Sequence, residues 1–201
     1  DLSRNYINGT IPSIFSRLSV SILSLLGNRL SGSIPEEIGG ISTLEELVLE
    51  DNLLGGPLPQ NLGRLSRLRR FLASANNFTG TIPESYGRLT SLEDFRIDGS
   101  SLSGRIPDFI GNWTNLTRLD LQGTSMEGPI PSTLSRLTKL KELRITDLAG
   151  ASRSRFPNLL DPEKLFTYWL YTCRHRAADQ FEAYGLELQQ FNWPNTRFSY
   201  A

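Results

Sequence analysis

The chain has 201 residues, which is enough for one domain with a sizeable core. Lys plus Arg and Asp plus Glu each number 21, and this zero net charge argues against a nucleic-acid binder with a basic face. A single cysteine, Cys173, excludes an internal disulfide, and a single histidine, His175, excludes a multi-histidine metal site. No apolar run reaches the roughly 20 residues that a membrane-spanning helix needs.

Internal repetition dominates the chain from its first residues. An early part of a unit, from Asn5 to Pro12, stands one residue out of phase with the rest. The unit is complete from Leu44 to Leu65, where it reads L-x-x-L-x-L-x-x-N-x-L-x-G-x-L-P-x-x-L-G-x-L. Glycines and prolines recur with a strict 24-residue period, at Gly32, Gly56, Gly80, Gly104, Gly128, Pro35, Pro59, Pro83, Pro107 and Pro131.

Each position of the unit has a mechanical role. Leu47 and Leu49 alternate with polar or exposed positions, as in a short strand with one buried face. Asn52 ends the strand, where its amide can bond the backbone of neighbouring turns, and Gly56 and Pro59 set the backbone of the descending segment. Because no unit can bury its leucines alone, the units must stack into a solenoid whose strands form one parallel sheet.

These motifs resemble the plant extracellular class of leucine-rich repeats over roughly residues 1–150. The resemblance implies an α/β solenoid with a parallel sheet on its concave face and a 24-residue period. Residues 96–148, followed by residues 156–159, are further similar to plant receptor-like kinases that carry a malectin-like domain. The most specific motifs are Gly32-Ser33-Ile34-Pro35, Gly80-Thr81-Ile82-Pro83, Gly104-Arg105-Ile106-Pro107 and Gly128-Pro129-Ile130-Pro131.

The asparagine column departs from this pattern toward the C-terminal end. It runs through Asn5, Asn28, Asn52 and Asn76, and continues as Ser100, Thr124 and Leu148. Serine and threonine can still bond the backbone but leucine cannot, so we expect the hydrogen-bonded ladder to weaken. The paired cysteines that cap the N-terminus in the resembled family are missing, so we also expect the first coil to expose an apolar end.

The composition changes after about residue 150, which divides the chain into repeats over 1–150 and an atypical tail over 151–201. The tail holds 11 of the 19 aromatic residues and one of the 17 glycines. One interpretation is a C-terminal cap, a short helical extension over residues 162–171, or a disordered segment. The other is translation in the wrong reading frame, because codons for residues 186–199 can be chosen whose shifted frame encodes W-S-F-N-N-L-T-G-P-I-P-D-S.

Two sets of candidate functional residues follow from the register. Four sequons for N-glycosylation begin at Asn8, Asn77, Asn112 and Asn115, and together they favour passage through the secretory route. The concave sheet is the usual binding surface of a solenoid. The candidate ligand-binding residues on it are Val48, Leu72, Arg96, Asp98, Arg118, Asp120 and Arg144.

The concave residues allow two interpretations. In the first they form a platform for a ligand or co-receptor, with the charges setting specificity. In the second the sheet is merely solvated, and its opposite charges pair across neighbouring strands. Val48 and Leu72 are expected to be exposed, and a contiguous exposed apolar patch favours a contact site.

Enzymatic interpretations find no support in the sequence. Asp94-Phe95-Arg96 resembles the kinase motif D-F-G but lacks its glycine. His175-Arg176-Ala177 resembles the kinase motif H-R-D but lacks its aspartate. We therefore expect a chain without catalytic residues, cofactor or metal. Its expected partners are a protein, peptide or glycan ligand and a co-receptor ectodomain.

The resemblance implies a parent receptor-like serine/threonine kinase in the plasma membrane, with this segment, a fragment of that parent, on the extracellular face. Two alternatives stay open. One is a secreted inhibitor of a wall-degrading enzyme, and the other is a non-functional product of a truncated gene.

Overall fold

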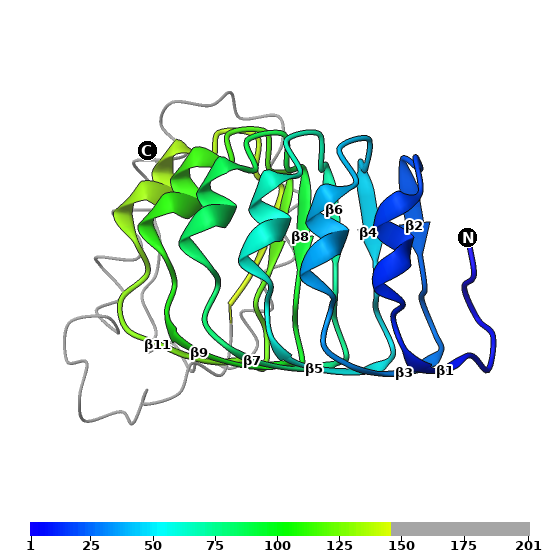
Figure 1. The fold of residues 1–201 in the computed structure, drawn as a ribbon. Coiled ribbons are helices and arrows are strands. Elements are labelled where there is room, and N and C mark those ends of the chain that lie inside the picture. The colour runs from blue at the N-terminus through cyan, green and yellow to red at the C-terminus, as the bar shows by residue number, and fades with distance from the viewer. Residues whose placement is uncertain (146–201) are drawn as a thin grey trace, which may run out of the picture.

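The computed structural model describes residues 1–145, which form a solenoid of stacked coils (Figure 1). Each complete coil consists of a three-residue strand, a second strand and a five-residue 3₁₀ helix. Coil 1 contributes β1 (Asn8–Thr10) and η1 (Ser13–Arg17); coil 2 contains β2 (Ile22–Ser24), β3 (Arg29–Gly32) and η2 (Glu36–Gly40); and coil 3 contains β4 (Glu46–Val48), β5 (Leu53–Pro57) and η3 (Gln60–Arg64).

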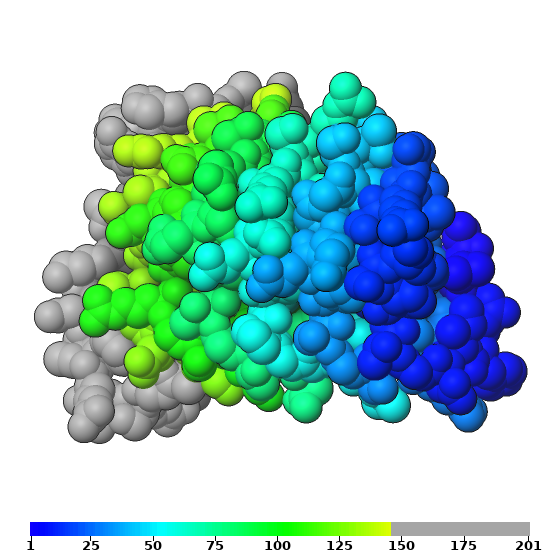
Figure 2. All heavy atoms as spheres, viewed as in Figure 1, coloured from blue at the N-terminus to red at the C-terminus, as the bar shows by residue number. Residues whose placement is uncertain are grey.

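The remaining coils repeat this order. Coil 4 contains β6 (Arg70–Leu72), β7 (Asn77–Gly80) and η4 (Glu84–Arg88); coil 5 contains β8 (Asp94–Arg96), β9 (Ser101–Arg105) and η5 (Asp108–Asn112); coil 6 contains β10 (Arg118–Asp120), β11 (Ser125–Glu127) and η6 (Ser132–Arg136), and β12 (Glu142–Arg144) follows it. Figure 2 shows the coils as successive slabs on the face that carries the 3₁₀ helices.

Two parallel sheets run along the solenoid, whereas the sequence predicted one. The concave sheet has the strand order β12-β10-β8-β6-β4-β2, and the second sheet has the order β1-β3-β5-β7-β9-β11. The second sheet forms because the backbone stays extended after the asparagine turn. From β3 onward it pairs residues that lie 22 positions apart, as Gly55↔Asn77 and Thr79↔Ser101 do, so its register is two residues short of the repeat period. In the concave sheet the register follows the 24-residue period, as in the pair Val48↔Leu72.

The leucines of the repeat face inward as predicted. Leu47, Leu49, Leu62 and Leu65 are at most 1 % exposed. In coils 4 and 5 larger side chains take over the inner positions of the strands and helices. The Phe71 and Phe95 ring centroids lie 5.3 Å apart, and those of Phe95 and Trp113 lie 4.9 Å apart; Trp113 Nε1 donates a hydrogen bond to the Tyr86 carbonyl oxygen at 2.9 Å.

The asparagine ladder forms as predicted in coils 2 to 4. Asn52 Nδ2 donates to the Leu25 carbonyl of the preceding coil at 2.9 Å, and Asn52 Oδ1 accepts from the Leu30 amide at 3.1 Å. The ladder weakens toward the C-terminal end as predicted, and Thr124 Oγ1 still bonds the backbone, at the Leu121 carbonyl of its own coil. The expectation that Ser100 also bonds the backbone is wrong, because its buried hydroxyl has no hydrogen-bond partner among the described residues. Leu148 and the predictions for 151–201 lie outside the described residues.

The N-terminal end of the solenoid is apolar and exposed, as the missing cap predicted. The exposed side chains there are Leu2, Tyr6, Ile7, Ile14 and Leu18.

Tyr86 carries a buried hydroxyl with no hydrogen-bond partner among residues 1–145. Its side chain is fully buried, and burial raises the pKa of this phenol well above its ordinary value. We expect Tyr86→Phe to raise the free energy of unfolding by about 1–2 kcal/mol, because it removes an unpaired buried polar group and keeps the ring. Urea unfolding of the full chain measures the change.

Tyr6→Phe is the matched control, because the Tyr6 side chain is 81 % exposed and its ring lies under the Arg29 guanidinium with or without the hydroxyl. It should leave stability within about 0.5 kcal/mol of the parent chain. A loss of stability in Tyr86→Phe would show that the hydroxyl has a partner in solution, and would contradict this interpretation.

Candidate binding face on the concave sheet

The concave sheet brings all seven candidate ligand-binding residues onto one surface. Six lie within its strands: Val48 in β4, Leu72 in β6, Arg96 in β8, Arg118 and Asp120 in β10, and Arg144 in β12; Asp98 follows β8 directly. The 24-residue period places them because equivalent residues of neighbouring strands are paired in parallel, as Leu72↔Arg96 and Asp120↔Arg144 are.

Leu72 is not exposed, and this part of the prediction is wrong. Its side chain is only 3 % exposed, whereas Val48 is half-buried and accessible in part. In the in-register sheet Leu72 lies between Val48 and Arg96, both bulkier than Ser24, which flanks Val48 on its other side. Strands stand about 4.8 Å apart, so a central residue with two large neighbours is screened from solvent.

An apolar area remains at the N-terminal half of the sheet. It consists of Ile22, Leu26 and Val48, of which Ile22 is 50 % exposed and the other two are half-buried. Neither β2 nor β4 places an arginine on this surface. The apolar half of the predicted face is therefore smaller than expected, but it is present.

The charges at the C-terminal half pair with one another. Arg118 lies between two carboxylates, with Nε 3.2 Å from Glu142 Oε2 and Nη2 3.7 Å from Asp120 Oδ2. Arg144 makes the same two contacts, at 2.7 Å to Glu142 and 3.7 Å to Asp120. These four side chains form one network across β10 and β12.

A second group of charges lies across β8 and the strand ends beside it. Arg96 donates to both carboxylate oxygens of Asp94, at 2.9 and 2.6 Å, and approaches Glu50 at 3.9 Å. Asp98 accepts a hydrogen bond from the Ser74 hydroxyl. The pairing that the second interpretation required is thus confirmed, and the arginines are held in place by carboxylates of the same face.

Burial raises the pKa of two of these acids. Asp120 is 2 % exposed, and burial raises the pKa of its carboxyl, although the Gln122 amide and the arginines partly oppose this effect. Burial likewise raises the pKa of Glu50, with Arg96 opposing it. A carboxyl group whose pKa is higher in the folded than in the unfolded state stabilises the fold only while it is protonated. The contribution of both groups to the free energy of unfolding therefore falls as the pH rises through the raised pKa.

The candidate set omitted the acids that organise the face. Asp94, Glu142 and Glu50 hold the arginines, and Glu46 pairs with Arg70 at 2.9 Å. The repeat period was the available signal, because it places Glu46, Arg70, Asp94, Arg118 and Glu142 in one column of alternating charge.

The four sequon asparagines lie away from the concave sheet. Asn8 and Asn77 are exposed in β1 and β7, and Asn112 is exposed at the end of η5, where its Nδ2 makes one long hydrogen bond of 3.4 Å. Asn115 is half-buried and makes two side-chain hydrogen bonds: its Nδ2 donates to the Thr90 carbonyl at 3.1 Å and its Oδ1 accepts from Lys139 Nζ at 2.7 Å. Asn115 is therefore the least suited of the four amides to carry a sugar.

Within residues 1–145 no group of His, Cys, Asp and Glu side chains is arranged to hold a metal ion. The same part of the chain contains no helix with the length and apolar character needed to cross a bilayer. Asp94-Phe95-Arg96 forms strand β8, so its likeness to a kinase motif is a coincidence of the repeat.

The sequence matches the family model described as Leucine Rich Repeat at residues 1–18, 19–41, 43–65 and 115–137. It is also 61 % identical, over 31 residues, to a probable LRR receptor-like serine/threonine-protein kinase of Arabidopsis thaliana. That alignment covers 15 % of this chain and 3 % of the relative. The chain thus spans only a small part of the length of the relative that it matches.

Solved structures of plant receptor ectodomains share the fold. The Arabidopsis receptor kinase HAESA, in complex with the peptide hormone IDA and the co-receptor SERK1, matches at 34 % identity with a TM-score of 0.70, over 72 % of this chain and 24 % of that chain. The LRR ectodomain of the receptor kinase SOBIR1 from Arabidopsis thaliana matches at 32 % identity with a TM-score of 0.58, over 64 % of this chain and 73 % of that chain.

Proposed function

Because the chain belongs to the leucine-rich-repeat family, in an array of the plant receptor-ectodomain type, we propose that its concave sheet binds an extended peptide. The array is a recognition module and not a kinase domain. The observation that carries the proposal is that this sheet has an apolar area at one end and paired charges at the other. Ile22, Leu26 and Val48 leave an accessible apolar area, and the arginines beyond it are held rigidly by carboxylates.

The chemistry of this face suits a peptide with an apolar end. Apolar side chains of the ligand would remove the N-terminal area from water, which supplies affinity roughly in proportion to the area buried. The pre-paired charges of β8, β10 and β12 supply orientation, because arginines fixed by neighbouring acids lose little freedom on binding. The HAESA complex, which holds a peptide hormone and a co-receptor, supports the same class of ligand and a co-receptor as a second partner.

Val48→Asp tests the proposal, with Leu53→Asp as its matched control. Both substitutions place a carboxylate on a strand surface, but Leu53 lies in β5 of the second sheet and is 66 % exposed. Linear peptides selected from a random displayed library against the full chain serve as probes in a titration calorimeter. We expect Val48→Asp to weaken binding at least roughly tenfold, which corresponds to a lost apolar contact of about 1.4 kcal/mol, and Leu53→Asp to leave it unchanged.

Equal losses in both variants, or peptides that bind Val48→Asp as tightly as the parent chain, would contradict the proposal. Circular dichroism of each variant establishes that the solenoid is intact. Leu72→Asp would be a poor probe, because burying a carboxylate at that position unfolds the sheet whether or not the face binds a ligand.

The wider setting of this segment is part of the same proposal. The parent would be a plasma-membrane receptor-like serine/threonine kinase of the subfamily with a malectin-like domain, this segment would be a fragment on its extracellular face, and Asn8, Asn77 and Asn112 would carry glycans. The 31-residue stretch that is 61 % identical to an Arabidopsis receptor-like kinase supports the kinase parent. Sequencing the transcript of this chain across codons 150–201 and beyond both ends tests the receptor parent. Repeats that resume in another frame and lead to a kinase would support the receptor. A stop codon in frame with the tail would favour a secreted inhibitor.

A further inference from the structure

The convex side of the solenoid is packed tightly at three junctions and loosely at one. A methyl group on Gly39, Gly63 or Gly111 would lie 2.2, 2.4 or 2.7 Å from a backbone carbonyl oxygen of the next coil. At Gly87, between coils 4 and 5, the three nearest atoms all belong to the Phe109 side chain, at 3.0 to 3.5 Å. The backbones of η4 and η5 therefore do not approach each other as closely as the other helix pairs do.

A convex hydrogen bond is also missing at this junction. Ser85 Oγ donates to the Gln60 carbonyl of coil 3 at 2.6 Å, and Thr133 Oγ1 donates to the Asp108 carbonyl of coil 5 at 2.7 Å. Phe109 holds the equivalent position in coil 5, and its ring has no hydroxyl to donate to coil 4. Coils 4 and 5 thus lose the bond that Ser85 and Thr133 make on either side of them.

On the convex side, two asparagine side chains still bond across the junction, both beyond the start of the helices. Asn112 Nδ2 reaches the Gly87 carbonyl at 3.4 Å, and Asn115 Nδ2 reaches the Thr90 carbonyl at 3.1 Å. Both bonds are exposed, so water can replace them at little cost in free energy. They lie where the chain turns back toward the concave strands, and they leave the starts of η4 and η5 unlinked.

The asparagine ladder fails at the same junction. Asn76 of coil 4 donates to the Leu49 carbonyl and accepts from the Leu54 amide, both in coil 3. The equivalent bonds from coil 5 would join position 100 to coil 4, but the Ser100 hydroxyl is buried and has no partner within residues 1–145. Coils 5 and 6 lose the ladder bond as well, since Thr124 bonds within its own coil, but they keep the convex bond of Thr133.

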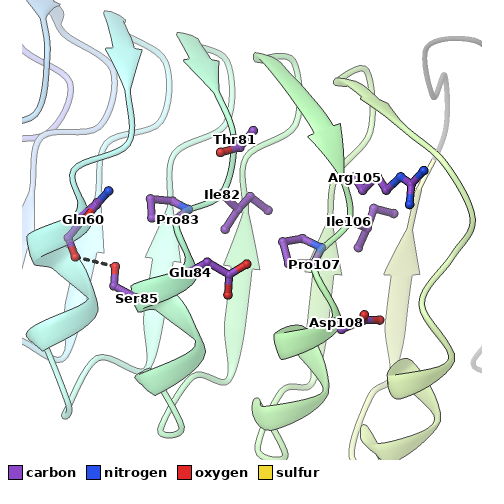
Figure 3. Close-up of a pocket in the computed structure, with 10 residues that line it drawn as sticks. All are labelled: Gln60, Thr81, Ile82, Pro83, Glu84, Ser85, Arg105, Ile106, Pro107 and Asp108. Atoms are coloured by element: carbon purple, nitrogen blue, oxygen red, sulfur yellow. Dashed lines mark hydrogen bonds between the residues drawn. The ribbon is translucent and has the colours of Figure 1, made fainter.

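A cavity of about 520 Å³ opens at the side of the junction (Figure 3). Its walls come from Ile82, Pro83 and Glu84 of coil 4 and from Ile106, Pro107 and Asp108 of coil 5. In Figure 3 the Glu84 side chain extends from coil 4 toward coil 5, across the space between the two walls.

Both parallel sheets and the core remain continuous across the junction, since β7 pairs with β9 and Ser103 Oγ donates to the Gly80 carbonyl at 3.3 Å. Strands β6 and β8 pair in register, the Phe71 and Phe95 rings stack at 5.3 Å, and Arg69 pairs with Glu93 at 2.9 Å. Trp113 adds its hydrogen bond to the Tyr86 carbonyl. An interface that is held along both sheets and loose only between the 3₁₀ helices can open at the helices while the sheets stay paired.

We propose that the junction between coils 4 and 5 is a hinge of the solenoid, which opens on the convex side about the concave sheet. Repeat arrays are stabilised by the sum of their nearest-neighbour interfaces, so one weak interface divides the array into two cooperative blocks. The hinge separates the apolar half of the concave face, in coils 2 and 3, from its charged half, in coil 5 and beyond. It does not depend on the proposed function of that face.

Native-state hydrogen exchange of the full chain, measured by mass spectrometry over a series of sub-denaturing urea concentrations, tests the hinge. We expect amide protection against exchange to be similar within coils 2–4 and within coils 5–6, and to change abruptly between the two groups. This change is the step at the junction. Ser100→Asn restores the ladder to coil 4 and should slow exchange in coils 5–6 roughly tenfold, which reduces the step.

Thr124→Asn is the matched control, because it makes the same repair at the junction whose convex bond is intact. It should leave the step between coils 4 and 5 in place. Protection that varies smoothly along the wild-type array would overturn the proposal without any variant. An equal reduction of the step by both substitutions would overturn it too, because the junction of coils 4 and 5 would then not be special.

Discussion

We expect Gly39→Ala to destabilise the solenoid by about 2–4 kcal/mol. The added methyl carbon would lie 2.2 Å from the Asn61 carbonyl oxygen, 2.5 Å from its carbonyl carbon and 2.9 Å from its Cβ. Two of these atoms belong to the backbone of η3, so no side-chain rotation can relieve the contact. The helices η2 and η3 would have to move apart, which would disturb the leucine core between coils 2 and 3. Urea-induced unfolding followed by circular dichroism measures the loss.

Gly40→Ala is the matched control for this prediction. Gly40 is the adjacent residue of the same helix, and a methyl group there meets no atom within 4 Å. Because its φ is not positive, alanine fits the backbone and should raise stability by a few tenths to about 1 kcal/mol by restricting the unfolded chain. If the two alanine variants had the same stability, the close approach of the convex helices would not exist in solution.

Asn76→Ala is expected to cost about 2–4 kcal/mol, because one side chain satisfies four backbone groups. Its Nδ2 donates to the Leu49, Ala73 and Ser74 carbonyls at 2.9, 3.2 and 3.1 Å, and its Oδ1 accepts from the Leu54 amide at 3.0 Å. Alanine would leave the Leu54 amide without this acceptor in the interior. The free energy of unfolding in urea gives the magnitude.

The neighbouring asparagine provides the comparison. Asn77 is exposed, its side chain makes no hydrogen bond within the described residues, and Asn77→Ala should change stability by less than about 0.5 kcal/mol. Both variants are best produced in a host that does not glycosylate, because Asn77 begins a sequon. Similar losses in the two variants would show that the ladder contributes little.

The hydrophobic period alone predicts most of the solenoid. Positions such as Leu47 and Leu65 can be assigned to the core because an inward residue recurs in every coil and no coil can bury it alone. The same period identifies the concave strands and the positions of the asparagine ladder, since each depends only on which residue type stands at a repeated position. It does not decide that Ser100 lacks a bond, because a serine hydroxyl can also donate to the backbone.

The exposure of a concave side chain and the pairing of its charge depend on neighbours that lie 24 residues away and on the size of their side chains. Leu72 occupies an outward position, but its exposure is decided by Val48 and Arg96 on the adjoining strands. The pairing of Arg118 and Arg144 with Asp120 and Glu142 likewise requires side-chain geometry, because the alternating charges of the sequence permit either paired or free arginines.

The sequence by itself therefore determined the repeat, its period, the inward leucines and the face on which the candidate residues lie. Only the tertiary structure decided that a second sheet forms, that Leu72 is buried, that the concave charges neutralise one another and that coils 4 and 5 meet loosely on the convex side. The physical reason is that the sequence period determines only which positions are equivalent from coil to coil. Packing across a junction depends on the pair of residues that meet there, and Gly87 meets Phe109 where Gly63 meets the backbone at Ser85.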